Sequence, residues 1–142
     1  MSEPLRLPPA PHLPGRTPRP DEAVFSGVKA PLDRCSTAAD FEGSAAFKAG
    51  FQCFLSGYFW EAHECWEAVW IRLPPASRER HLLTALIQLA NARLKATMGN
   101  ASASARILKR ASAAWSEAFS GAQHRVLGVS SVDWAAFAGK LA

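Results

Sequence analysis

Residues 57–70, GYFWEAHECWEAVW, place one histidine and three glutamates among three tryptophans. On a helix, which turns about 100° per residue, one apolar face holds Phe59, Ala62, Trp66, Val69 and Leu73. His63 and Glu67, one turn apart, lie at an edge of this face and can form a hydrogen bond. Glu64 and Glu61 are expected to point increasingly outward. The pattern therefore predicts a carboxylate and an imidazole that lie close together in a partly buried position.

A histidine and a carboxylate in such a place could act as general base and acid, because burial and a neighbouring charge move pKa values toward neutrality. They could also begin a metal site, since imidazole nitrogen and carboxylate oxygen suit several divalent ions. The string HECWE resembles the HExxH zinc helix, but Glu67 stands where the second histidine is required. A third interpretation is structural, with His63 hydrogen-bonded at the edge of the core. His63, Glu64 and Glu67 are therefore candidate catalytic residues, and the sequence identifies no metal or cofactor.

Arg93 adds another polar group, near the centre of the apolar face of the helix expected at residues 77–98. A guanidinium cannot lose its proton in a protein, so a buried Arg93 needs a carboxylate, and Glu67 or Glu64 is the expected partner. The alternative is that its long stem carries the charge to solvent near the helix end.

The sequence predicts an all-α fold, a compact bundle of four to five helices in antiparallel hairpins, with no strand. Apolar residues recur at helical spacing over about 43–56, and Gly57 suits the C-terminal end of that helix. A second helix over 58–72 ends at the prolines of LPP, residues 73–75. Ser77 is expected to be the N-cap of a third, broadly apolar helix. A fourth helix follows the GN turn at 99–100, and residues 132–142 predict a short closing helix.

Residues 1–40 are predicted to form an extended proline-rich arm ahead of a helical domain over residues 41–142. Eight of the ten prolines fall within the first 31 residues, where they remove backbone donors and disfavour helix. Leu5, Leu7, Leu13 and Phe25 are apolar enough to dock on the domain. The sequence leaves open whether the arm is docked or disordered.

The 142 residues are 49% hydrophobic and 20% charged, which indicates one globular domain with a single core. The first residues lack the pattern of a secretory signal, and the longest uncharged helical stretch is too short to cross a bilayer, so we expect a cytoplasmic protein without a membrane partner. Three cysteines without a CxxC pair indicate free thiols. Residues 72–142 hold ten basic and three acidic side chains, which we interpret as neighbours of the acidic second helix.

Several segments together resemble one family: FLSGYFWEAHECWEAVW at 54–70, Arg80, LL at 82–83, LIQLANA at 86–92 and GN at 99–100. This set is similar to the DUF309 family, small helical proteins of bacteria and archaea whose function is not established. The resemblance covers about residues 44–119 and points to Gly57, His63, Glu64, Trp70, Arg80 and Gln88. Lys95 stands near where members often carry histidine, which puts a two-histidine metal site in doubt.

Three classes of function remain open. The first, which we favour, is a protein- or peptide-binding or scaffold module, in which His63, Glu64, Glu67 and Arg93 form a structural polar cluster. The second is an enzyme or a metal- or small-ligand-binding protein that uses the same three His and Glu residues. In both, Trp70, Arg80, Gln88 and Arg93 are the candidate ligand-binding residues.

The third class, nucleic-acid binding, ranks last because Arg106, Lys109, Arg110 and Arg125 are not interleaved with aromatic residues on one face. A protein partner or a second copy of the chain is the expected partner. Tyr58 and Trp60 are expected to be exposed and to offer a dimer face.

Overall fold

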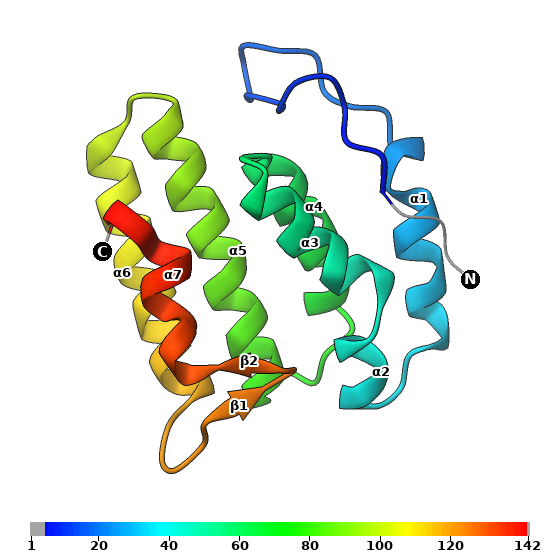
Figure 1. Ribbon diagram of the computed structural model, residues 1–142, viewed down its shortest axis with the longest axis vertical. Helices are drawn as coiled ribbons and strands as arrows, with labels where there is room; N and C mark the ends of the chain where they lie inside the picture. Colours follow the sequence, from blue (N-terminus) through cyan, green and yellow to red (C-terminus); the bar gives the residue numbers. More distant parts are fainter. Residues whose placement is uncertain (1–4, 142) are drawn as a thin grey trace.

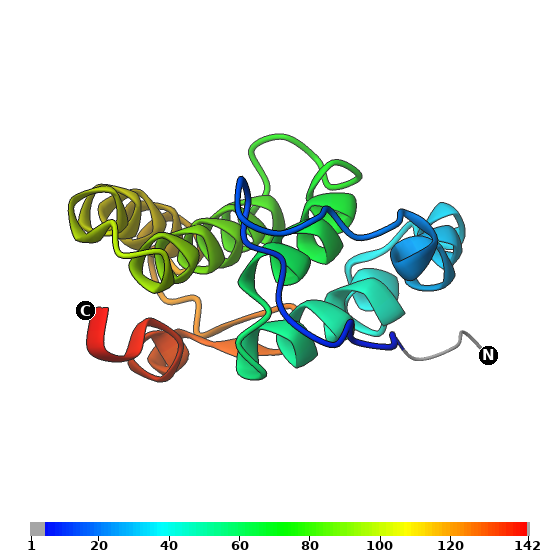
Figure 2. The same ribbon diagram turned by 90° about the horizontal axis from the view of Figure 1, so that it is seen from above.

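The computed structural model describes residues 5–141, and Figures 1 and 2 show it from two directions. The predicted all-α class is confirmed. The α-helices are α1 (Ala23–Lys29), α2 (Ala38–Glu42), α3 (Ala45–Leu55), α4 (Phe59–Trp70), α5 (Arg78–Thr97), α6 (Ala101–Ala118) and α7 (Trp134–Ala138). Short 3-10 helices are η1 (Ala30–Arg34), η2 (Ser131–Asp133) and η3 (Gly139–Leu141).

Two antiparallel hairpins, α3–α4 and α5–α6, form the centre of the fold, with α5 packed against both α4 and α6. Each hairpin turns at a glycine with φ +83°, Gly57 or Gly99, a backbone conformation that favours glycine. The Ser77 side chain accepts a hydrogen bond from the Arg80 N–H and caps α5, as predicted. In Figure 2, α3 and α7 lie on one side of the layer formed by α4, α5 and α6.

The core is centred on Trp66 of α4, which is fully buried. Its indole lies against the bare backbone of Gly50 in α3, where an added Cβ would come within 2.0 Å of Nε1. The indole N–H donates to the Phe47 carbonyl oxygen at 3.2 Å. Phe51 and Phe54 pack on the same ring, so α3 and α4 are joined mainly by aromatic contacts.

The proline-rich arm is docked, which resolves the alternative that the sequence left open. Residues 5–20 contain no helix or strand, and in Figure 1 they pass over the end of the α3–α4 hairpin (blue). The extended prediction is wrong for much of residues 21–40, because α1, η1 and the start of α2 are helical. Phe25, Val28 and Leu32 are buried in the common core and explain why this stretch folds onto the domain.

The prediction of no strand also needs correction, because Arg125–Val126 and Val129–Ser130 pair as a two-residue antiparallel ladder. This small β-hairpin leads the chain from α6 to α7, the predicted closing helix. All three cysteines are free, as predicted. Within residues 5–141, no helix has both the length and the apolar character required to cross a membrane.

Candidate functional site

A cavity of about 260 Å³ opens between α4 and α5. Glu67 and Trp70 line it from α4, while Thr84, Ile87 and Gln88 line it from α5. Residues three or four positions apart share one face of a helix, so each helix contributes a single stripe to the cavity. We call these five residues, with the adjoining His63 and Arg80, the α4–α5 groove. Thr84 and Ile87 were missed as site residues from the sequence, although Thr84 lies one helical turn before Ile87 and the predicted Gln88.

Trp70 is fixed in the groove by contacts on its ring edge and its ring face. Its indole N–H donates to the Thr84 hydroxyl at 3.0 Å, and that hydroxyl donates in turn to the Arg80 carbonyl oxygen at 3.0 Å. The Arg80 guanidinium lies over the ring, 4.0 Å from its centroid, in cation–π contact. The predicted ligand-binding residues Trp70, Arg80 and Gln88 therefore gather in one place.

His63 and Glu67 form the hydrogen bond expected from their spacing, with 2.5 Å between Nε2 and Oε2. The side chains are 26% and 55% exposed, so water reaches both. Glu67 holds the imidazole with one carboxylate oxygen and also lines the cavity. An imidazole and a carboxylate placed in this way are groups that general acid–base chemistry uses.

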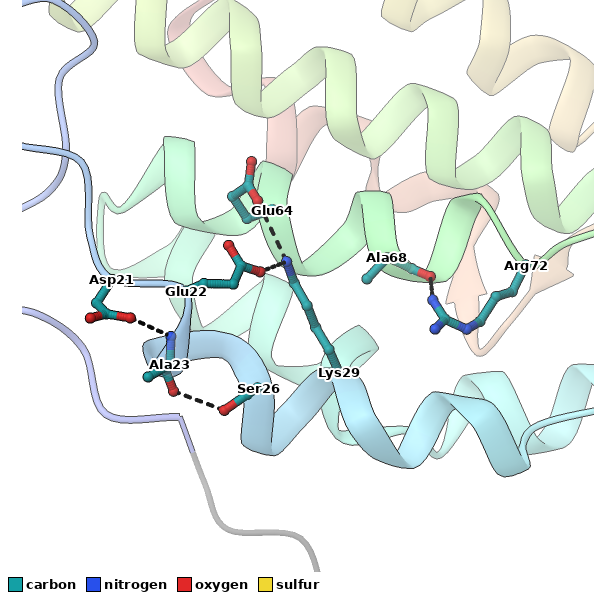
Figure 3. Close-up of polar contacts among 8 residues, drawn as sticks. All are labelled: Asp21, Glu22, Ala23, Ser26, Lys29, Glu64, Ala68 and Arg72. Atoms are coloured by element: carbon teal, nitrogen blue, oxygen red, sulfur yellow. Dashed lines mark hydrogen bonds and ion pairs between the residues drawn. The ribbon is translucent and has the colours of Figure 1, made fainter.

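Glu64 lies apart from this pair, although it is the neighbour of His63 in sequence. Successive helix residues point about 100° apart, and Glu64 faces α1, where the Lys29 ammonium lies 3.5 Å from its carboxylate. Figure 3 shows the Lys29 side chain between Glu64 and Glu22, and its distance to Glu22 is 2.9 Å. Among residues 5–141, no three His, Cys, Asp or Glu side chains gather in a way that could hold a metal ion.

The predicted pairing of Arg93 with Glu64 or Glu67 is wrong. Its guanidinium packs on two aromatic rings, 5.3 Å from the centroid of Phe59 and 5.8 Å from that of Phe54. It also reaches the end of α7, where a Cβ added to Gly139 would come within 2.9 Å of Nη1. Arg93 is half-buried, so cation–π contact and partial hydration take the place of the expected carboxylate. The polar cluster proposed from the sequence thus lacks its arginine.

Glu61 is fully buried, which corrects the expectation that it points outward. One carboxylate oxygen accepts the His12 backbone N–H at 2.8 Å, and the other has no hydrogen-bond partner among the described residues. Burial raises the pKa of this carboxyl above its ordinary value, although the His12 hydrogen bond acts in the opposite direction. The neighbouring Cys53 thiol also has a raised pKa, because of its hydrogen bond with Cys65 and its burial. No periodic pattern in the arm could have located this contact.

Tyr58 and Trp60 are half-buried by the arm, so the exposure that suggested a dimer face is not observed. The Tyr58 hydroxyl donates to the Pro8 carbonyl oxygen, and the Trp60 ring packs on the rings of His12 and Phe25.

Comparison with known proteins gives one match. The profile of the family described as "Domain of unknown function (DUF309)" matches residues 47–107, from α3 into α6, and so includes the α4–α5 groove. No curated protein and no solved structure was found to match the chain. The match confirms the family predicted from the sequence, over a shorter range than expected. Residues 47–107 of this chain therefore form a domain of the DUF309 family, whose function is unknown.

Proposed function

We propose that this chain is a binding module whose α4–α5 groove takes a short peptide segment carrying a basic side chain. The observation that carries the proposal is the cavity of about 260 Å³ with polar and apolar groups from two helices. This volume lies below the range of about 300–1,000 Å³ usual for small-molecule sites and suits one or two side chains of a longer ligand.

Different groove residues would contact different parts of the peptide. Trp70 and Ile87 offer apolar surface, and the indole is held in place by Thr84 and Arg80. The Gln88 amide makes no hydrogen bond with the described residues, so it can pair with both groups of a peptide bond. Glu67 is more than half exposed and can accept a lysine or arginine side chain.

A phage-displayed library of random short peptides, selected on the immobilised full chain, tests this proposal. We expect the selected peptides to share a basic residue next to an apolar one. Their affinity should fall by about tenfold, or 1.4 kcal/mol, in the Glu67→Gln and Gln88→Ala variants. Glu117→Gln, an exposed site on α6, is the matched control and should bind normally. Peptides that bind all three variants equally, or no enrichment at all, would contradict the proposal.

A second candidate, metal or small-ligand chemistry at His63 and Glu67, is favoured by one observation: the hydrogen-bonded pair adjoins the cavity. Two donors on one helix bind a divalent ion only if the ligand or water completes its coordination. Metal analysis of the purified chain distinguishes the candidates. Stoichiometric metal that disappears in His63→Gln would favour this second function, and metal-free wild-type chain that binds selected peptides would favour the first.

A further inference from the structure

Residues 5–20, which we call the arm, are held on the α3–α4 hairpin by backbone hydrogen bonds and by the buried side chains of Leu5 and His12. Gln52 Nε2 donates to the Leu5 carbonyl oxygen at 3.4 Å. Tyr58 Oη donates to the Pro8 carbonyl oxygen at 2.6 Å. These two contacts do not depend on which side chains the arm carries at those positions. The hairpin therefore holds the arm by two backbone carbonyl oxygens, three residues apart in the sequence.

A third backbone contact lies further along the arm, where the His12 N–H donates to Glu61 Oε2 at 2.8 Å. Glu61 is fully buried beneath the arm, and its other oxygen, Oε1, has no partner among the described residues. A buried carboxylate with an unused acceptor is a group that would gain from a second donor. The arm donates a hydrogen bond to only one of the two Glu61 oxygens, so a ligand with one more donor could bind more tightly.

The composition of the arm suits a segment that can leave the hairpin and be replaced there by another segment. Its prolines restrict the backbone before binding, which reduces the entropy lost on docking, and they bring no N–H that needs a partner. A turn from Leu13 to Thr17, with Gly15 at φ +78°, places the Thr17 hydroxyl 2.8 Å from His12 Nδ1. The bound conformation is thus partly preformed within the arm itself.

Trp60 adds an aromatic surface that is selective for charge. The His12 ring meets it edge-on with centroids 4.6 Å apart, and the Arg19 guanidinium lies 5.5 Å from its centroid. The arm has three arginines and no acidic residue. Contact of a cation with an aromatic face, beside a buried carboxylate, favours basic ligands.

We propose that Gln52, Tyr58, Trp60 and Glu61 form a binding site for a basic, proline-rich extended segment of another protein. The arm is the resident ligand of this site in the free chain, and a competing segment displaces it. The site is separate from the α4–α5 groove, because Glu61 and His63 lie about 160° apart around α4. The inference therefore goes beyond the proposed function and can fail independently of it.

Fluorescence anisotropy with a labelled synthetic peptide of residues 5–20 tests the proposal on the full chain. His12→Pro removes the arm's own N–H donor while leaving the site unchanged. We expect the peptide to bind this variant at least about tenfold more tightly than the wild-type chain, whose tethered arm competes at an effective concentration near the millimolar range. Absence of binding to the variant, or equal binding to both chains, would overturn the proposal.

Two controls test the specificity of the binding. The same peptide with proline in place of His12, or with a scrambled sequence, should bind His12→Pro at least about tenfold more weakly than the wild-type peptide. Tyr58→Phe, added to His12→Pro, should weaken wild-type peptide binding about fivefold, the effect of one hydrogen bond. Equal binding of the scrambled peptide would reduce the site to nonspecific attraction and overturn the proposal.

A second measurement covers the case in which His12→Pro does not fold. In the isotopically labelled wild-type chain, an excess of unlabelled peptide should shift the His12 amide resonance as the arm is displaced, and an unchanged resonance at saturating peptide would overturn the proposal. Light scattering of the wild-type chain identifies the remaining alternative. Dimers that form with rising concentration and disappear in Tyr58→Phe would assign the site to the arm of a second copy instead of another protein.

Discussion

Glu61 and Glu67 lie on the same helix, in opposite surroundings. Glu61 is fully buried under the arm and makes one hydrogen bond, with a backbone N–H. Glu67 lines an open groove, is more than half exposed and binds an imidazole. The helical period places them on different sides of α4, yet it does not determine which side is buried. Burial depends on what covers each side. A second helix lies beside the groove, whereas a segment without periodicity covers Glu61.

The comparison separates two kinds of polar residue. On the groove side, no buried side-chain polar atom of the described residues lacks a hydrogen-bond partner, as expected for a surface that water can reach. On the arm side, a carboxylate has been enclosed with fewer donors than it can accept. The Glu61 oxygen without a partner shows that hydrogen bonding is less complete on the arm side than on the groove side. Both sides depend on the same core beneath them.

The largest effect should come from removing that core. Trp66→Ala deletes a fully buried indole that bridges α3 and α4, and we expect a loss of about 3–5 kcal/mol in the free energy of unfolding. Trp70→Ala is the matched control on the groove side. It removes one hydrogen bond and one cation–π contact from a half-buried ring, so we expect a loss of about 1–2 kcal/mol. Urea unfolding followed by circular dichroism measures both, and equal losses would contradict the assignment of Trp66 to the shared core.

The next effect concerns pH and the arm side. Burial raises the pKa of Glu61 above its ordinary value of 4.5, so the folded chain binds a proton more tightly there than the unfolded chain does. The free energy of unfolding should therefore fall as pH rises from 4.5 through the raised pKa. The groups that face this carboxyl are the His12 backbone N–H, the His12 side chain and the Cys53 thiol, in addition to the residues of α4 itself. Glu61→Gln should remove this component of the pH dependence.

Urea unfolding at several pH values measures this effect. Relative to the wild-type chain, Glu61→Gln should gain stability between pH 4 and pH 8, because its side-chain amide does not ionise. Glu117→Gln, at an exposed position, is the control and should follow the wild-type chain within about 0.5 kcal/mol. A Glu61→Gln curve parallel to that of the wild-type chain would show that this carboxyl is not enclosed in solution.

The difference between the two sides also explains what the sequence could predict. The helices, the Ser77 cap, the turns at Gly57 and Gly99, and the His63–Glu67 hydrogen bond all follow from local spacing. Each depends on residues within one turn or one cap of each other. The structure agrees at each of these positions.

The contacts that were missed join segments far apart in the chain. Glu61 meets His12 across 49 residues, and no local pattern specifies where a proline-rich segment crosses a helix. Arg93 was expected to find a carboxylate, but the sequence could not show that aromatic rings from α3 and α4 would lie nearer. Glu64 was named with His63 as a candidate residue and was expected to point further outward, but the sequence could not show that Lys29 of α1 would meet it. The catalytic or ligand-binding roles of His63, Glu64 and Arg93 stay predictions.

The smallest effect is expected at the ion pair that ties α1 to α4. Lys29 and Glu64 are partly buried, and Lys29 is shared with the exposed Glu22, which weakens its dependence on either partner. A double-mutant cycle with Lys29→Met and Glu64→Gln should give a coupling of about 0.2–1 kcal/mol, and added salt should reduce it. The pair of Arg72 and Asp33, more exposed at 2.9 Å, is the matched cycle and should give the smaller coupling. A Lys29–Glu64 coupling well above this range would mean that α1, like the arm, encloses a carboxylate of α4, and the contrast between its two sides would then extend over the whole outer surface of the helix.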